Sequence, residues 1–242
     1  MSGMAGATDR VVRRLDQLVL AELEPGAELP SESDLARELA VSRLTVREAV
    51  RALQARGLVD IRRGRRPRVA YPNAAPVGDF FASVIRRDPR QLLDLIEVRL
   101  ALEVHIAGLA ARRASRASLA AMELAVATMR DTARSTPDPD AIHAADLRFH
   151  QALAAASGNQ LLDFLIEAME APLRASRMQS LRGHLTRGGT VEDVVEQHAR
   201  ILDRVAAHDA AGAAAAMREH LTQTARDLRA AFALTDTTEE SA

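Results

Sequence analysis

The sequence predicts a mainly α-helical protein of two domains: an N-terminal unit of three helices closed by a two-strand β-hairpin, and a C-terminal all-helical antiparallel bundle. Apolar residues recur at helical spacing along most of the chain, and a strand pattern occurs only in a basic stretch before residue 70. Two prolines and a glycine mark a break between these regions. We therefore expect a first domain, a linker, a second domain and a disordered tail, at residues 1–71, 72–78, 79–234 and 235–242.

The first domain is expected to contain a helix-turn-helix. A first helix spans about residues 8–23, where apolar residues have helical spacing. Two further helices follow, joined by a tight turn near Ala40. Ser31 and Ser42 precede them, at positions where a hydroxyl accepts a hydrogen bond from a free N–H group of the first turn. The second of these two helices has the features of a recognition helix, because its apolar side faces inward and arginines occupy its exposed turns.

A basic hairpin follows the recognition helix. Val59, Ile61 and Val69 flank the sequence RRGRRPR, which predicts two short strands around a basic tip. Between residues 43 and 68, nine arginines are opposed by only two acidic residues. A charge run by itself is more often a solvated surface, but its combination with a helix-turn-helix and a wing indicates binding to the phosphate backbone of double-stranded DNA.

The segment from Leu29 to Gly64 contains LPSE-x-x-LA, then VSR-x-x-VREA, then GLV and a final glycine. This pattern resembles the winged helix-turn-helix of the GntR family of bacterial transcription regulators. Ser33 departs from it, standing where the family often has a contacting arginine, and Ala40 stands where a turn glycine is common. The resemblance implies contacts to operator bases and phosphates from the recognition helix, and to the minor groove from the wing. The residues concerned are Ser42, Arg43, Thr45, Arg47, Arg63 and Gly64.

Charge is divided unevenly along the chain. Up to Gly78, 13 arginines are opposed by 10 acidic residues, and beyond it 19 are opposed by 23. The basic end is expected to meet nucleic acid and the acidic end to do something else. The absence of cysteine excludes disulfides and thiolate metal sites. Because the N-terminus does not resemble a signal peptide and no apolar run approaches membrane-spanning length, we expect a cytoplasmic protein without a membrane partner.

From residue 79 onward the apolar pattern is helical only. Amphipathic stretches are separated by short breakers that contain proline, glycine, serine, asparagine or aspartate. This alternation predicts a bundle of antiparallel helices. The expected helices span approximately residues 79–87, 90–113, 116–134, 139–156, 160–182, 190–207 and 210–233.

Polar residues interrupt the apolar stripes of this bundle. Asp146 and His150 lie one turn apart on the same helix, and His198 and His220 lie on the inward faces of two later helices. Burying such groups unpaired costs roughly several kcal/mol, so something must satisfy them. Each histidine by itself could be a hydrogen-bonded core residue, but three histidines and an aspartate together favour a metal site. Imidazoles and a carboxylate suit zinc first, with nickel, manganese or iron as alternatives.

The same residues carry a second resemblance. The motifs DLRFH, EQHARI and REHL contain Asp146, His150, His198 and His220. They resemble the ligand-binding C-terminal domain of the FadR-like (FCD) branch of GntR regulators. The resemblance implies that these four residues hold a divalent metal inside the helical bundle.

Arg99 and Glu103 are also expected to face the interior, because both lie on an apolar stripe of the helix at 90–113. One interpretation is an internal ion pair at i, i+4 spacing. The other is that Arg99 binds the carboxylate of a ligand that also occupies open positions on the metal, since a guanidinium matches a carboxylate with two parallel hydrogen bonds. The family resemblance implies small organic acids as effectors. Arg174 is a second candidate for the same contact.

Together these predictions describe an operator-binding transcription regulator controlled by a small carboxylate, with a metal in its effector domain. A homodimer is expected, because one recognition helix reads only a few base pairs and a pseudo-palindromic operator supplies the remaining specificity. Two alternatives remain open: a metal-dependent enzyme tethered to DNA, and a regulator whose metal is purely structural. No residue has a spacing that marks it as a general base, which disfavours the enzyme.

Overall fold

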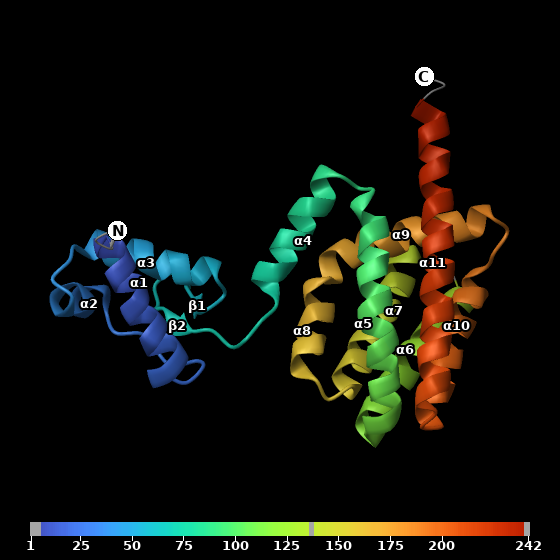
Figure 1. Ribbon diagram of the computed structural model, residues 1–242, viewed down its shortest axis with the longest axis horizontal. Helices are drawn as coiled ribbons and strands as arrows, with labels where there is room; N and C mark the ends of the chain where they lie inside the picture. Colours follow the sequence, from blue (N-terminus) through green and yellow to red (C-terminus); the bar gives the residue numbers. More distant parts are fainter. Residues whose placement is uncertain (1–5, 136–137, 240–242) are drawn as a thin grey trace, which may run out of the picture. The chain divides into compact units, whose positions relative to one another are not determined.

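The computed structural model describes residues 6–135 and 138–239. It divides into two compact units, Met1–Pro76 and Val77–Ala242, and both are built mainly from helices (Figure 1). The predicted fold class is confirmed. The boundary between the units falls within the predicted linker, although a helix already begins at residue 75.

The N-terminal unit is a winged helix-turn-helix. Its helices are α1, which continues into a short π-helical turn, η1, and then α2 and α3; the hairpin is formed by β1 and β2. Their bounds are Ala7–Gln17 (α1), Leu18–Glu22 (η1), Glu32–Glu38 (α2), Arg43–Ala55 (α3), Val59–Asp60 (β1) and Arg68–Val69 (β2). The strands pair antiparallel with Val59 opposite Val69. Both valines are buried in the core of this unit, so the wing is anchored at its base while its arginines stay exposed.

Local signals fix the helix-turn-helix. Ser31 and Ser42 accept hydrogen bonds from the backbone N–H groups of Asp34 and Thr45, at 3.1 and 3.0 Å, and thereby cap α2 and α3 as predicted. Between the two helices Ala40 adopts a φ of 53°. This left-handed conformation is unfavourable for a residue with a Cβ atom, so alanine is a strained choice at this turn.

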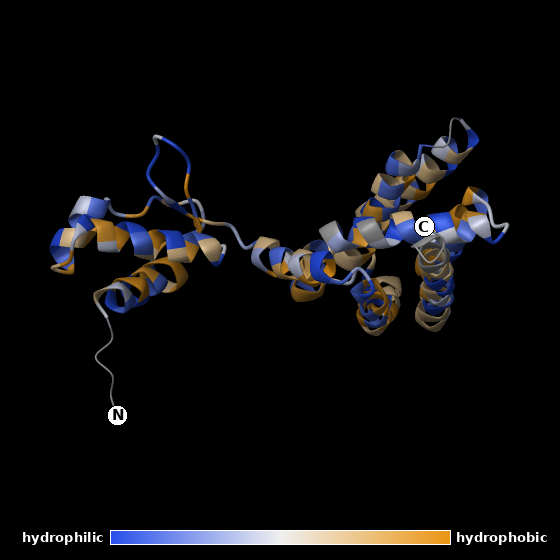
Figure 2. Ribbon diagram, turned by 90° about the horizontal axis from the view of Figure 1, so that it is seen from above, coloured by the Kyte–Doolittle hydropathy of each residue, from blue (hydrophilic) through white to orange (hydrophobic). Residues whose placement is uncertain are grey.

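The C-terminal unit is a bundle in which α11 packs against α5 and α9, and α6 packs against α7 and α10. The helices are Ala75–Arg87 (α4), Gln91–Arg113 (α5), Arg116–Arg134 (α6), Pro139–Ala156 (α7), Gln160–Ala168 (α8), Glu170–Thr186 (α9), Val191–Ala206 (α10) and Ala210–Glu239 (α11). Every helix carries both hydrophilic and hydrophobic residues (Figure 2). Within the described residues, none of them combines the length and the apolar character that a bilayer crossing needs.

Two boundaries differ from the sequence analysis. The single helix expected at 160–182 is broken after Ala168, because Pro172 has no N–H group to donate to the carbonyl four residues earlier. The tail expected to be disordered from residue 235 is helical as far as Glu239, and its last residues, 240–242, lie outside the described part of the chain.

Candidate metal centre

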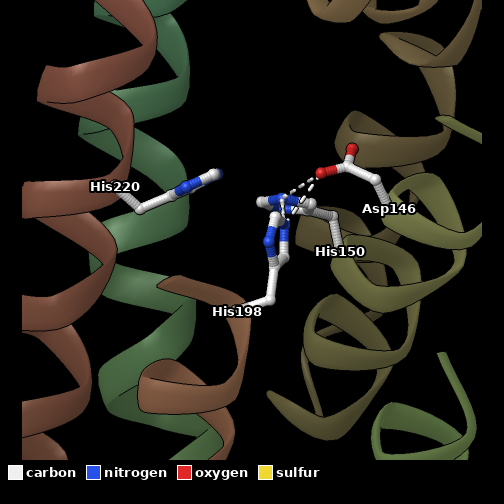
Figure 3. Close-up of side chains that lie close together, drawn as sticks. All are labelled: Asp146, His150, His198 and His220. Carbon is white, nitrogen blue, oxygen red and sulfur yellow. Dashed lines mark hydrogen bonds and ion pairs between the residues drawn. The ribbon is translucent and has the colours of Figure 1, made fainter. Parts of the chain in front are cut away.

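Four buried side chains from three helices meet inside the bundle. Asp146 and His150 lie one turn apart on α7, His198 comes from α10 and His220 from α11 (Figure 3). Each is at most 7% exposed. One potential ligand atom of each residue lies within 4.8 Å of the other three. The structure thus brings together the four residues that the sequence singled out.

The shortest distances join His198 to its neighbours. Its Nε2 atom lies 2.8 Å from Oδ1 of Asp146 and 3.3 Å from Nε2 of His150. The distance from Nε2 of His150 to Oδ1 of Asp146 is 3.8 Å. The ring of His220 completes the group, with its centroid 4.6 Å from that of His198. All four side chains point toward a common centre in Figure 3.

The other nitrogen of each imidazole has its own acceptor. Nδ1 of His198 lies 2.7 Å from the backbone oxygen of Val194, and Nδ1 of His220 lies 2.8 Å from Oε1 of Gln197. Nδ1 of His150 contacts the buried carboxylate of Glu103. Because a carbonyl or carboxylate oxygen only accepts, each Nδ1 donates its proton. In their neutral form the three rings therefore turn their Nε2 lone pairs toward one another and toward Asp146.

Lone pairs at these distances repel one another unless a positive charge lies between them. A proton could bridge only two of the four groups, and burial opposes it: desolvation lowers the pKa of His150 to about 4 and holds that of His220 well below its usual value. A divalent ion would satisfy all four at once. Hydrogen bonds from the opposite ring nitrogens to carbonyls or carboxylates are the usual support of metal-binding histidines. The donor set therefore fits a divalent transition metal.

A buried ion pair between Arg99 and Glu103 contacts the centre through His150. Nε of Arg99 donates to Oε1 of Glu103 at 2.6 Å, and the second oxygen of Glu103 contacts His150. Burial tends to raise the pKa of the Glu103 carboxyl, but the charge of Arg99 and the hydrogen bonds from His150 and Arg99 bring it below its ordinary value. Nη1 and Nη2 of Arg99 have no hydrogen-bond partner among the described residues. Both interpretations of Arg99 are thus compatible: one edge of its guanidinium is paired and the other is free.

A cavity of about 50 Å³ adjoins the centre. Its walls include Arg99, Asp146, Arg177 and His220. Arg174 is not among the lining residues; its side chain is exposed and pairs with Asp140 at 2.7 Å.

Arg177, one turn beyond Arg174 on α9, was missed by the sequence analysis. It is 7% exposed and forms an ion pair with Asp146. Desolvation alone would raise the pKa of the Asp146 carboxyl, but the charge of Arg177 holds it well below its ordinary range. A signal was present, because Arg177 shares an apolar stripe with Leu173 and Leu181 at i, i+4 spacing.

His143, on α7, also lines the cavity. It is 8% exposed, and its Nδ1 atom has no hydrogen-bond partner among the described residues. Burial, together with the charge of Arg177, lowers its pKa. A neutral imidazole at the wall adds a group that can donate to or accept from a ligand.

The recognition helix presents the predicted DNA-contacting residues at its N-terminal end. The hydroxyls of Ser42 and Thr45 lie 2.9 Å apart, and Arg43 and Arg47 are exposed. Arg47 makes a bidentate ion pair with Glu32 of α2, with Nε–Oε1 and Nη2–Oε2 distances of 3.1 and 2.8 Å. This hydrogen bonding lowers the pKa of Glu32. The sequence analysis did not predict the pair, which joins two helices.

The tip of the wing is a turn. The backbone N–H of Arg65 donates to the carbonyl of Arg62 at 3.1 Å, and Gly64 adopts a φ of 74°. Arg63 and Gly64 are exposed, and a Cβ atom at Gly64 would meet nothing within 4 Å. Glycine is therefore required here by its backbone conformation and not by crowding.

Comparison with known proteins follows this division of the chain. Residues 7–69 match the family described as bacterial regulatory proteins, gntR family, and residues 94–223 match the FCD domain. The chain is 33% identical over 202 residues to the HTH-type transcriptional regulator LutR of Bacillus subtilis (strain 168), which covers 83% of this chain and 91% of that protein. It is 30% identical over 227 residues to the galactonate operon transcriptional repressor of Escherichia coli (strain K12), with coverages of 92% and 96%. The solved structure of Streptococcus agalactiae GntR has a TM-score of 0.73 and 30% identity, and the match covers 90% of this chain and 99% of that one.

These relatives are regulators of transcription and not enzymes, which removes the support for a DNA-tethered enzyme. Both halves of the match agree with the winged helix-turn-helix and the helical bundle described above. The chain therefore belongs to the gntR family of bacterial regulatory proteins, as a DNA-binding transcription regulator whose FCD domain responds to small-molecule effectors.

Proposed function

We propose that this regulator binds a pseudo-palindromic operator as a homodimer and that a small organic acid, bound beside a divalent metal, changes its affinity for DNA. Asp146, His150, His198 and His220 hold the metal, zinc being the first choice and nickel, manganese or iron the alternatives. The observation that carries this proposal is the set of three buried imidazoles whose Nδ1 atoms are all engaged and whose Nε2 atoms converge with a carboxylate.

Arg99 is proposed to bind the carboxylate of the effector. Its free guanidinium edge lines the cavity that also contains Asp146 and His220, so a short acid can reach the arginine and the metal together. Fixing Nε through Glu103 orients the two free Nη atoms for a bidentate contact. The metal supplies positive charge and open coordination positions for the acid. The name of one relative, the galactonate operon transcriptional repressor, contains an organic acid, although a larger one.

DNA recognition is assigned to the exposed residues of α3 and the wing. Arg43 and Arg47 are suited to donate two hydrogen bonds to guanine, and the basic wing is suited to the phosphate backbone and minor groove. Effector control requires that the acid bind two arrangements of the dimer with different affinities. The molar mass measured by light scattering is expected to be twice that of one chain.

Metal binding can be tested with matched histidine variants. The purified protein is dialysed, and its bound metal is identified by elemental analysis. His198→Gln is expected to lose the ion, whereas His105→Gln, which changes an exposed histidine of α5, is expected to keep it. Retention of the ion by the His198→Gln protein would refute the assignment.

Effector control is tested on a duplex selected from random DNA by the zinc-loaded protein. Glycolate, lactate and malonate are then added, and the affinity for the selected duplex is measured. A change with at least one acid, lost in Arg99→Gln, supports the proposal. If chelation lowers the melting temperature while no acid changes DNA affinity or stability, the metal is purely structural.

Arg43→Ala and Arg47→Ala are expected to weaken binding to the duplex, and Arg116→Ala, an exposed change in α6, is the control.

A further inference from the structure

The cavity beside the metal centre contains two arginines, of which the proposed function uses one. Arg99 is 1% exposed and Arg177 is 7% exposed, and both line the cavity. Neither side chain has a hydrogen-bond partner for Nη1 or Nη2 among the described residues. A buried guanidinium nitrogen without an acceptor destabilises the fold, because its desolvation is not compensated. The cavity therefore contains two sets of donors that a bound ligand could satisfy.

Each arginine is already balanced by one carboxylate. Arg99 pairs with Glu103, and Arg177 pairs with Asp146. Each histidine of the centre donates through Nδ1, and a histidine that binds a metal is neutral and turns its other lone pair toward the ion. The remaining acid of the cavity wall, Asp227, is paired with Arg187, whose Nε lies 3.8 Å from Oδ1, and is also hydrogen-bonded to Gln223 at 2.9 Å.

This arrangement leaves the charge of a divalent ion uncompensated. With the protein groups balanced against one another, binding the ion adds two positive charges to a buried site that already contains two guanidiniums. A monocarboxylate would neutralise one of these charges, and a dianion would neutralise both. A second carboxylate would also supply acceptors to the second guanidinium, since one carboxylate accepts only one complete bidentate contact.

The cavity also limits the size of the ligand. Its volume of about 50 Å³ is small beside the roughly 300–1,000 Å³ of clefts that hold drug-sized molecules. This small space favours a ligand in which the two anionic groups are separated by no more than a short spacer.

We infer that the effector is a dicarboxylate of two or three carbons, with one carboxylate at Arg99 and the other at Arg177. The inference rests on the proposed function, because it names the class of acid bound at the same site. It assigns to Arg177 the recognition of the second carboxylate, in addition to its pairing with Asp146. His143 also lines this cavity, and its Nδ1 atom has no partner among the described residues, so its imidazole can donate one further hydrogen bond to that group.

The test compares two acids that differ only in the second carboxylate. Calorimetric titrations of the zinc-loaded full-length protein use malonate and 3-hydroxypropionate as probes. Malonate is expected to bind roughly 10- to 100-fold more tightly, the equivalent of a charge-assisted hydrogen-bonded contact. This comparison needs no variant, so it remains decisive if a substituted protein does not fold.

A matched pair of variants locates the preference. Arg177→Lys keeps the charge beside Asp146 but loses the planar pair of donors, and it is expected to weaken malonate binding while leaving that of 3-hydroxypropionate in place. Arg174→Lys, an exposed change on the same helix, is expected to keep the wild-type preference. Malonate could also weaken its own apparent binding by removing zinc from the protein. That effect would be the same in both variants, and it is measured as the amount of zinc in the dialysate.

The outcomes separate this inference from the proposed function. Equal binding of the two acids would overturn the dicarboxylate assignment, and an unchanged preference in Arg177→Lys would overturn the role given to Arg177. Either result would leave a carboxylate effector intact. If neither these acids nor any monocarboxylate bound, the proposed effector site itself would be wrong, and the inference would fall with it.

Discussion

Replacing Gln197 by leucine should weaken metal binding although it changes none of the four proposed metal ligands. Oε1 of Gln197 lies 2.8 Å from Nδ1 of His220 and accepts its proton. Leucine has nearly the same volume but no acceptor, so the Nδ1–H group of a buried ring loses its partner. An unsatisfied buried donor costs about 1–3 kcal/mol, and loss of such a supporting contact lowers metal affinity about 10- to 100-fold. The two figures agree, since tenfold corresponds to about 1.4 kcal/mol.

The measurement is a competition for zinc between the protein and a chromophoric chelator. Gln160→Leu, at an exposed position at the start of α8, is the matched control and should retain wild-type affinity. His220→Ala provides the lower limit, because it removes the ligand itself. Wild-type affinity in Gln197→Leu would show that the orientation of His220 does not depend on Gln197, and the tautomer argument for the centre would lose one of its three contacts.

Three further outcomes are expected. Ala40→Gly should stabilise the N-terminal unit by about 1 kcal/mol by relieving a left-handed alanine, measured as slower amide exchange in α3, while Ala52→Gly inside that helix should speed it. Glu32→Gln should free Arg47, so that affinity for nonspecific duplex DNA rises and discrimination between operator and nonspecific DNA falls; unchanged discrimination would contradict this. Gly183→Ala should lower the melting temperature of the bundle, because its Cβ would lie 1.9 Å from a carbonyl oxygen of α11.

Local signals made the N-terminal unit predictable. Caps at Ser31 and Ser42 depend on residues three positions away, and the wing depends on apolar residues flanking a glycine turn. Pro172 is also a local signal for the break after Ala168, but the apolar periodicity on both sides of it predicted one continuous helix. The pair between Arg47 and Glu32 could not be deduced from spacing, because it depends on how α2 and α3 cross.

For the candidate metal centre, the sequence predicted which residues come together but not which atoms they contact. Periodicity placed His198 and His220 on inward faces, because a helix that buries its apolar stripe carries any polar residue of that stripe inside. The acceptors for the ring nitrogens depend on tertiary packing: Gln197 reaches His220 only through the contact between α10 and α11, and Glu103 reaches His150 across α5 and α7. For the same reason the choice between Arg174 and Arg177 required the exact face that α9 presents to the bundle.

Glu103 connects the two halves of the effector site. One of its oxygens holds Arg99 and the other holds His150, so the arginine and the histidine share a single anion. Thermodynamic linkage makes any such dependence reciprocal: an acid that strengthens retention of the metal must itself be held more tightly, by the same factor, when the metal is present. If the proposed function holds, the regulator would bind its acid weakly in a cell depleted of the metal, and the promoter would respond only when both the metal and the acid are present.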